Sequence, residues 1–371
     1  MGSHAVVRVA ILETSGKIIA SFSSQQRAYH SAATTAKAST TAAGFGTTSP
    51  RADINTGRWI DSIRNGFAGS VGKTPLIRLN TISKDTGSEI LVKAEYANAG
   101  GSVKDRAALF LLIDAIERGQ LRFDGKEPGT VVEGTAGNTG IGLAHCCLAL
   151  GLRCVIFMPN NQSQEKVDIL RALGAQVFSV PVVPWTDQEN YNHQARRYAE
   201  KLENAVWTNQ FDNVANTRAH YETTGPEIWQ QTEGKVDAVV FGTGTGGTIA
   251  GVSRYLKERN KNIQVFLADP QGSVLYKWIK EGKLERFEAS ILCILQTFRL
   301  LNEEGFFCGA SSGLNVAAAV DVAKLMGPGK TVVSCLCDNG QKYFKRLFSK
   351  KALMDAGLLE FVPEKYQLSL R

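Results

Sequence analysis

The sequence has no run of apolar residues that approaches the roughly 18 needed to cross a membrane. It also has no internal repeat and no basic patch interleaved with aromatic side chains, so nothing in it indicates a solenoid or a nucleic-acid-binding surface. Its 371 residues are 43% hydrophobic and 21% charged, which is ordinary for a globular chain with one or two domains.

Cysteine is present, but without the spacing of a disulfide framework. An odd count with irregular spacing predicts reduced, mostly buried thiols in a reducing compartment. Cys335 and Cys337 alternate along a predicted strand and would share one face. A metal pair is the alternative there, although no second cysteine pair or histidine accompanies it. The seven cysteines are Cys146, Cys147, Cys154, Cys293, Cys308, Cys335 and Cys337.

Acidic residues are nearly absent from residues 1–52, which carry five Lys/Arg and one acid, or +4 of the net charge of +7. This Ser/Thr/Ala-rich stretch has too little apolar surface to order itself. We therefore expect a disordered leader at 1–52, and its composition is typical of a mitochondrial transit segment. A plain disordered tail is the alternative. The rest of the chain is only weakly basic and predicts no nucleic-acid partner.

Beyond the leader, apolar strands alternate with helical stretches, in two successive series. Strands separated by helices predict parallel sheets covered by helices, so the expected fold class is α/β with two domains and a ligand cleft between them. A smaller domain is expected at 98–208, and a larger one from 53–97 plus 209–371. Helices are also expected at 53–65, 188–202 and 317–326.

Lys104 lies in the small-residue loop Gly100–Arg106, directly before an apolar helical run. A turn at this junction can aim the side chain inward, and lysine amines form Schiff bases with carbonyl compounds. The alternative is a solvated lysine in the first helical turn, which is the usual state of an isolated lysine. Three other stretches, at 135–140, 242–248 and 309–313, favour the chemical role.

The stretch Gly242–Thr248 follows an apolar strand and precedes a helix. Its glycines let the backbone wrap tightly, and N–H groups at the start of a helix point toward an anion, so the loop predicts a phosphate site. It also fits the dinucleotide fingerprint G-x-G-x-x-G, with Asp269 at the end of the next strand. The hydroxyls of Thr245 and Thr248 favour a phosphate monoester over a dinucleotide.

A second strand-to-helix turn, Gly134–Gly140, offers backbone N–H groups and the side chains of Thr135, Asn138 and Thr139 to a carboxylate or a ring oxygen. A plain turn capped by Asn or Thr is the alternative. Ser311 and its neighbour Ser312 precede an alanine-rich helix and would, on their own, be ordinary N-caps.

Taken together, these stretches resemble the fold-type II pyridoxal-phosphate enzymes, most closely the cysteine synthase (O-acetylserine sulfhydrylase) family, including fungal mitochondrial members. The resemblance runs in order from about Ile63 to Phe348, and Gly72–Leu76 is similar to the family's opening I-G-x-T-P-L motif. It implies pyridoxal 5'-phosphate as cofactor, O-acetyl-L-serine and sulfide as substrates, and a homodimer.

The resemblance also implies a role for individual residues. Lys104, in the family's S-x-K motif, would bond to the cofactor aldehyde, Asn138 would contact the ring hydroxyl, and Ser311 would face the pyridine nitrogen. Phosphate would bind to Gly244, Thr245, Gly246, Gly247 and Thr248. The substrate carboxylate would be held by the T-A-G-N-T-G loop and a following glutamine: Thr135, Ala136, Gly137, Thr139 and Gln210.

The implied reaction is β-elimination of acetate followed by addition of sulfide, with Lys104 as base. A serine/threonine dehydratase-like or cystathionine β-synthase-like enzyme, and a non-catalytic homologue, are the alternatives. Two departures from the family pattern favour impaired catalysis. Residues 271–296 lack the family's G-I-G segment, and Asn339 stands where the family more often has Ser or Thr.

Overall fold

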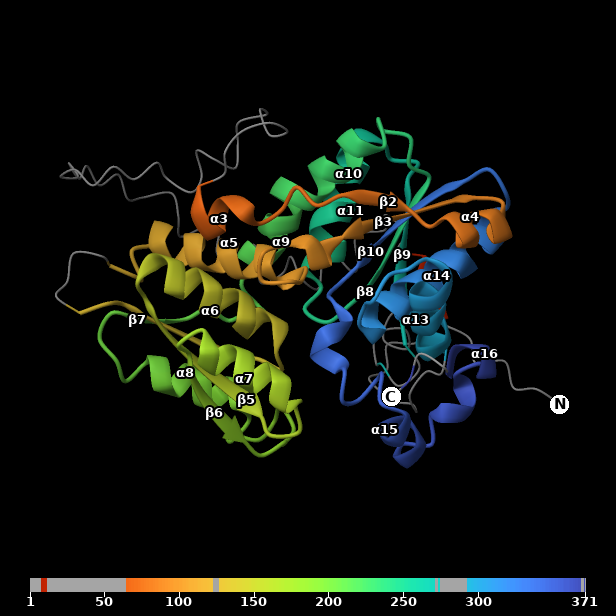
Figure 1. Cartoon of the computed structure of the whole chain (residues 1–371). Coiled ribbons are helices and arrows are strands. Elements are labelled where there is room, and N and C mark those ends of the chain that lie inside the picture. The colour runs from red at the N-terminus through yellow and green to blue at the C-terminus, as the bar shows by residue number, and fades with distance from the viewer. Residues whose placement is uncertain are drawn as a thin grey trace.

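The structure is a computed structural model that describes residues 8–11, 65–122, 127–270, 273, 292–367 and 370. Its strands form two sheets, one of six strands and one of four, and Figure 1 shows each sheet with its helices as a separate lobe. The predicted α/β class with mostly parallel sheets is confirmed. Apart from β1, which lies within residues 1–52, the strands of each sheet come from one of the two predicted domains, and the domain boundaries themselves stay a prediction.

The smaller sheet is parallel throughout, in the order β6-β5-β4-β7. Alternate residues of β4 point to opposite faces, so Val131 packs against α5 and α6 while Val132 packs against α8. Burial on both faces accounts for the near-continuous apolar strands. The elements of this lobe are β4 Thr130–Gly134, β5 Arg153–Pro159, β6 Gln176–Val180, β7 Ala205–Trp207, α3 Gly66–Ser70, α5 Lys104–Glu117, α6 Asn138–Leu150, α7 Gln164–Ala172 and α8 Tyr191–Ala199.

The larger sheet has the order β1-β9-β8-β10-β3-β2, with antiparallel strands at its two edges. Val240 packs toward α14 on one face, and its neighbour Val239 packs toward α11 on the other. The strands are β1 Arg8–Ile11, β2 Leu76–Arg78, β3 Glu89–Ala94, β8 Ala238–Gly242, β9 Gln264–Asp269 and β10 Thr331–Leu336. The main helices are α4 Asn80–Thr86, α9 Ala215–Ala219, α10 Gly225–Gln231, α11 Gly247–Arg259, α13 Leu292–Glu303 and α14 Ala310–Met326.

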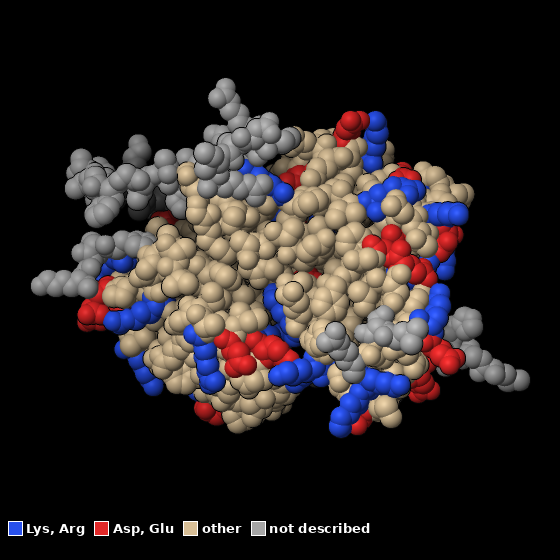
Figure 2. All heavy atoms as spheres, in the orientation of Figure 1, with Lys and Arg blue, Asp and Glu red and all other residues tan. Residues whose placement is uncertain are grey.

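Short helical elements complete the described chain. They are the 3₁₀ turns η1 Glu95–Ala97, η3 Gly340–Tyr343 and η4 Leu359–Phe361, the π-helical turn η2 His220–Thr224, and the C-terminal helices α15 Lys350–Asp355 and α16 Glu364–Gln367. Within the described residues, no helix has both the length and the apolar character that a membrane crossing requires. Figure 2 shows Lys and Arg interspersed with Asp and Glu over the described part of the visible face.

The prediction of a disordered leader is wrong for Arg8–Ile11, which pairs antiparallel with β9. The average composition of 1–52 hides a short run rich in valine at 5–12, a composition that favours a strand. The rest of the leader lies outside the described residues, as does the helix predicted at 53–65 apart from Asn65.

Two helix boundaries and one short strand also differ from the predictions. The helix expected at 188–202 covers only α8, because Asn190 caps it by accepting a hydrogen bond from the Asn192 backbone N–H. The helix expected at 317–326 begins earlier, at Ala310, after Gly309 in extended backbone. Strand β7 was missed because it has only three residues. The interval without a G-I-G motif lies mostly outside the described residues, and its last part, 292–296, opens α13.

Candidate active site

Lys104 is the first residue of α5, and the loop before it is held by backbone contacts to the end of β10. The Val103 N–H donates to the Cys337 carbonyl at 2.8 Å, and Ser102 forms an isolated bridge with Asp338. The partly buried Lys104 side chain places its Nζ 3.4 Å from Thr245 Oγ1, 141 positions along the chain. Burial lowers the pKa of the Lys104 amine, an effect that the nearby sulfurs of Cys337 and Cys335 oppose, and a neutral amine is the nucleophilic form.

A chain of hydrogen bonds joins this contact to the other predicted stretches. Asn216, at the start of α9, donates its Nδ2 to Thr245 Oγ1 at 2.8 Å and to the Gln210 carbonyl at 2.9 Å. Gln210 Oε1 accepts from Thr139 Oγ1 at 2.6 Å, and its Nε2 donates to the Gly134 carbonyl at 3.0 Å. The lysine loop, the phosphate loop and the T-A-G-N-T-G loop therefore meet at one place.

The phosphate loop turns into α11 through Gly246, which has a φ of 82° that favours glycine. A Cβ at Gly247 would lie 2.1 Å from Asn216 Oδ1, whereas a Cβ at Gly244 would meet nothing within 4 Å. The Thr243 hydroxyl is buried and has no hydrogen-bond partner among the described residues. A free hydroxyl, open space and the N-terminus of a 13-residue helix together fit a phosphate group.

Thr248, the last predicted phosphate residue, contacts His220 Nε2 through its Oγ1 at 3.1 Å. Burial lowers the pKa of His220 to about 3, so this histidine is neutral at ordinary pH and holds the helix start in place.

In the T-A-G-N-T-G loop, the side chains of Thr135 and Thr139 are buried and bonded within the protein, while Ala136 is exposed. Gly137 has a φ of 153° and a backbone N–H that donates to Thr135 Oγ1. Asn138 donates its Nδ2 to Asp338 Oδ2 at 2.7 Å and accepts from Lys342 Nζ at 3.2 Å. Asn138 therefore lies beside the lysine loop, in contact with the segment after β10.

The two serines at the start of α14 differ in their surroundings. Ser312 is fully buried, and its Oγ accepts a hydrogen bond from the Cys337 N–H at 2.9 Å. Ser311 is exposed, so its hydroxyl is open to a ligand. Among the two, Ser311 is the one whose setting suits the predicted role.

Residues after β10 belong to this site, although the sequence identified no role for them. Lys342 is buried and reaches the carbonyls of Gly100 and Gly101 at 3.4 and 3.3 Å as well as Asn138. Tyr343 donates its hydroxyl to Asp338 Oδ2 at 2.6 Å. The position of these residues beyond the carboxyl end of a parallel strand, where α/β sheets bind ligands, was the available signal.

Glu133, at the end of β4, supports the segment around Gln210. Its Oε2 accepts from Thr208 Oγ1 at 2.5 Å and from the Gln210 N–H at 3.2 Å. Burial raises the pKa of this carboxyl to about 7, although these hydrogen bonds oppose the shift.

A buried ionic cluster supports α5, the helix that begins with Lys104. Arg106, in the first turn of α5, forms ion pairs with Glu95 at 2.7 Å and with Glu227 at 2.6 Å, and Lys93 pairs with Glu227 at 2.7 Å. Glu227 also accepts the Lys73 N–H at 2.9 Å, so the cluster ties the Gly72–Leu76 turn to α5.

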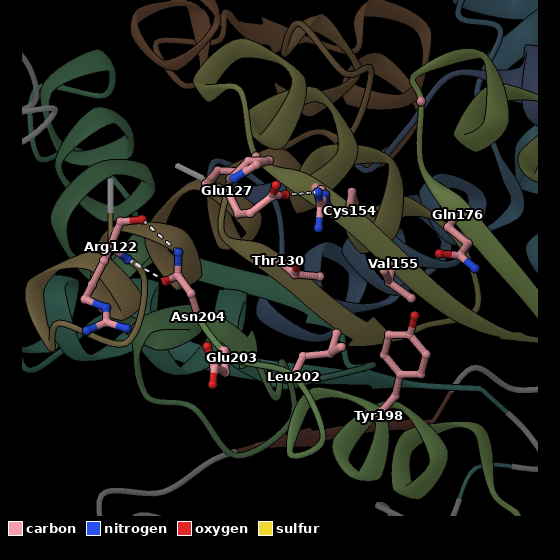
Figure 3. A pocket seen from close by; sticks show the side chains of 14 residues that line it. Arg122, Glu127, Thr130, Cys154, Val155, Gln176, Tyr198, Leu202, Glu203 and Asn204 are labelled. Carbon is pink, nitrogen blue, oxygen red and sulfur yellow. Dashed lines mark hydrogen bonds and ion pairs between the residues drawn. The ribbon is translucent and has the colours of Figure 1, made fainter. Parts of the chain in front are cut away.

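A separate hollow of about 960 Å³ lies at the amino ends of β4 and β5, where Thr130 and Arg153 begin these strands (Figure 3). None of the predicted site residues lines it, since they follow the carboxyl ends of the strands. Sheets of this kind bind ligands at the carboxyl ends, so the hollow is not the candidate active site. No group of three or more potential metal ligands occurs among His, Cys, Asp and Glu in the described part of the chain.

Comparisons with known proteins show the family to which the chain belongs. The family model "Pyridoxal-phosphate dependent enzyme" matches residues 67–291. Cysteine synthase 1 of Neurospora crassa is 54% identical over 337 residues, which cover 82% of this chain and 89% of that protein. Cysteine synthase 1 of Emericella nidulans is 52% identical over 337 residues, which cover 81% of this chain and 90% of that protein. The crystal structure of O-ureido-L-serine synthase superposes with a TM-score of 0.69 at 30% identity and covers 79% of this chain and all of its own. The chain therefore belongs to the family of pyridoxal-phosphate-dependent enzymes.

Proposed function

We propose that this chain is a cysteine synthase that converts O-acetyl-L-serine and sulfide into L-cysteine and acetate. The observation that carries the proposal is the contact between Lys104 Nζ and Thr245 Oγ1, extended by hydrogen bonds to Gln210 and Thr139. The names of the two fungal relatives, both cysteine synthases, support the same substrates.

The residues present fit pyridoxal 5'-phosphate. The phosphate loop offers an unpartnered hydroxyl at Thr243, open space beside Gly244 and the N-terminus of α11, and Lys104 reaches the same loop. Lys104, Asn138, Ser311 and this loop would hold the cofactor. When bound, pyridoxal phosphate supplies an aldehyde for the lysine and an electron-withdrawing ring that makes the α-proton of an amino acid acidic.

Lys104 is the base that accepts the α-proton at its Nζ, and burial favours the neutral form that can do so. Backbone N–H groups of the T-A-G-N-T-G loop, together with Gln210, bind and orient the substrate carboxylate. Ser311 carries no charge, so unlike a carboxylate it would not keep the facing ring nitrogen protonated. This property favours loss of the β-substituent, here acetate, before sulfide adds at the same carbon.

The test compares three reactions of the purified, cofactor-loaded protein at equal concentration. We expect L-cysteine from O-acetyl-L-serine plus sulfide to form fastest. Cystathionine from L-serine plus homocysteine, or ammonia from L-serine or L-threonine, should form far more slowly. A faster rate in either of these assays would replace the proposal with a cystathionine β-synthase-like or dehydratase-like function. Bound cofactor without any turnover would indicate a non-catalytic homologue.

We also propose that the chain forms a homodimer and is imported into mitochondria. The resemblance to the cysteine synthase family supports the dimer, and the basic, acid-poor composition of residues 1–52 supports import. Light scattering should give twice the mass of one chain, and a value for a single chain would contradict the dimer. A fluorescent protein fused to residues 1–52 should accumulate in mitochondria, and diffuse fluorescence would contradict the targeting role.

A further inference from the structure

Cys335 and Cys337 form a thiol pair at the end of β10, with their sulfur atoms 3.7 Å apart. Cys335 is buried, while Cys337 is only partly buried and can be reached by a small oxidant. A disulfide bond is about 2.05 Å long, so closing it would bring the two sulfurs roughly 1.6 Å nearer. Cys147 and Cys154 also interact through their thiols, but both of these residues are buried, whereas Cys337 is partly exposed.

The backbone of Cys337 is bonded to two parts of the cofactor site. Its carbonyl accepts from the Val103 N–H at 2.8 Å, and Val103 directly precedes Lys104. Its N–H donates to Ser312 Oγ at 2.9 Å, next to Ser311. A shift of Cys337 would therefore disturb both the lysine loop and the start of α14.

Asn315 connects the same thiol pair to the phosphate loop. Its Nδ2 donates to the Cys335 carbonyl at 2.9 Å and lies 3.3 and 3.2 Å from the sulfurs of Cys335 and Cys337. Its Oδ1 accepts from the N–H of Gly242, the first residue of that loop, at 2.7 Å. The amide thus contacts both sulfurs on one side and the loop on the other, so closure of a disulfide would alter its position.

We propose that Cys335 and Cys337 are a redox modification site whose reversible disulfide weakens the hold of this chain on its cofactor. Hydrogen peroxide oxidises the accessible Cys337 thiol to a sulfenic acid and is reduced to water. The Cys335 thiol then attacks that sulfur, a disulfide forms, and a second water leaves with the sulfenic oxygen. The two electrons come from the thiol pair. Two cysteines separated by one residue at the end of an extended strand form a strained bond, and such bonds are readily reduced by small thiols.

The test treats the cofactor-loaded protein with hydrogen peroxide and then removes the excess with catalase. We expect two of the seven thiols to be lost, and peptide mapping should place the bond between Cys335 and Cys337. When the treated protein is ultrafiltered, released cofactor should appear in the filtrate. The rate of cysteine formation should fall at least about tenfold, since small displacements at an active site have effects of that size. Dithiothreitol should restore the thiols, the bound cofactor and the rate.

Two variants make the result specific to this pair. Cys337→Ser should keep its cofactor under peroxide, whereas Cys293→Ser, which alters the other partly buried cysteine, should respond like the wild type. Cys335→Ala is the second variant if Cys337→Ser does not fold. Seven intact thiols in treated wild type, a mapped disulfide without cofactor loss, or equal loss from Cys337→Ser would each overturn the proposal. The thiol count, the peptide map and the amount of released cofactor can be measured without any turnover. These three results therefore test the disulfide independently of the proposed function.

Discussion

Replacement of Glu227 by glutamine is expected to destabilise the protein strongly, because it removes one charge from a balanced buried cluster. Glu227 accepts hydrogen bonds from Arg106 at 2.6 and 2.8 Å and from Lys93 Nζ at 2.7 Å. Burial would raise the pKa of Glu227, but Arg106 and Lys93 outweigh it and hold the pKa well below its ordinary value. With Glu95 unchanged, two cations would face a single anion.

Removal of one partner from a buried ion pair costs about 3–5 kcal/mol, because an uncompensated charge stays in the interior. Over roughly 280 described residues, the entropy of unfolding is about 0.6 kcal/mol per kelvin, so the unfolding midpoint should fall by about 5–8 °C. The second substitution Lys93→Met would restore neutrality. The Thr74 carbonyl would still accept from Gln231 Nε2 at 3.0 Å, so we expect the double variant to regain part of the lost stability.

Thermal unfolding of the cofactor-free protein, followed by circular dichroism, measures these differences. The matched control is Glu233→Gln, which removes the same charge from an ion pair with Lys235 whose side chains are more than three-quarters exposed. This control should leave the midpoint unchanged. A Glu227→Gln midpoint equal to that of the control, or a double variant no more stable than the single one, would refute the reasoning about buried charge.

Three further predictions concern the site. Above pH 4.5 the folded state keeps a proton on Glu133 that the unfolded state releases, so this residue makes the wild type lose about 3 kcal/mol of stability between pH 4.5 and 7. Urea unfolding measured across this pH range should show that Glu133→Gln lacks this loss. Equal pH dependence of the unfolding free energy in the two proteins would contradict the prediction. Gly247→Ala should lower both the thermal unfolding midpoint and the cofactor affinity measured by spectroscopic titration, because its Cβ meets Asn216. Gly244→Ala should lower the affinity alone, since its Cβ meets nothing within 4 Å. Equal losses of the unfolding midpoint in the two variants would count against this geometry. Lys342→Met should reduce kcat/KM roughly 10–100-fold, because it removes the contact of the amine with Asn138. The control is Lys345→Met, which alters an exposed lysine nearby. Equal kcat/KM values for the two variants in steady-state assays would show that Lys342 does not position the site.

Short glycine-rich loops could be identified from the sequence because their function depends on local backbone conformation. The turn at Gly246 needs a positive φ, and the phosphate loop precedes a helix whose start was predicted within one residue. Lys104 could be singled out because the loop, the helix and the residue type coincide.

Residues that act through long-range packing could not be found in the same way. Asn216 and Asn315 are ordinary helix residues in the sequence, and only the fold brings them to Thr245 and Gly242. Lys342 looks like one more surface lysine until η3 folds its amine onto Asn138. Strand β1 was missed for the opposite reason, since a local run was averaged into a long polar leader.

Borohydride reduction of the cofactor-loaded protein, followed by peptide mass analysis, tests the role of Lys104 most directly. Reduction makes the bond between a lysine and the cofactor permanent, so the modified peptide identifies the residue. We predict a single modified site at Lys104, and loss of the visible absorbance band of the bound cofactor in Lys104→Ala. Modification of a different lysine, or an unchanged cofactor spectrum in Lys104→Ala, would contradict the assignment on which the proposed function depends.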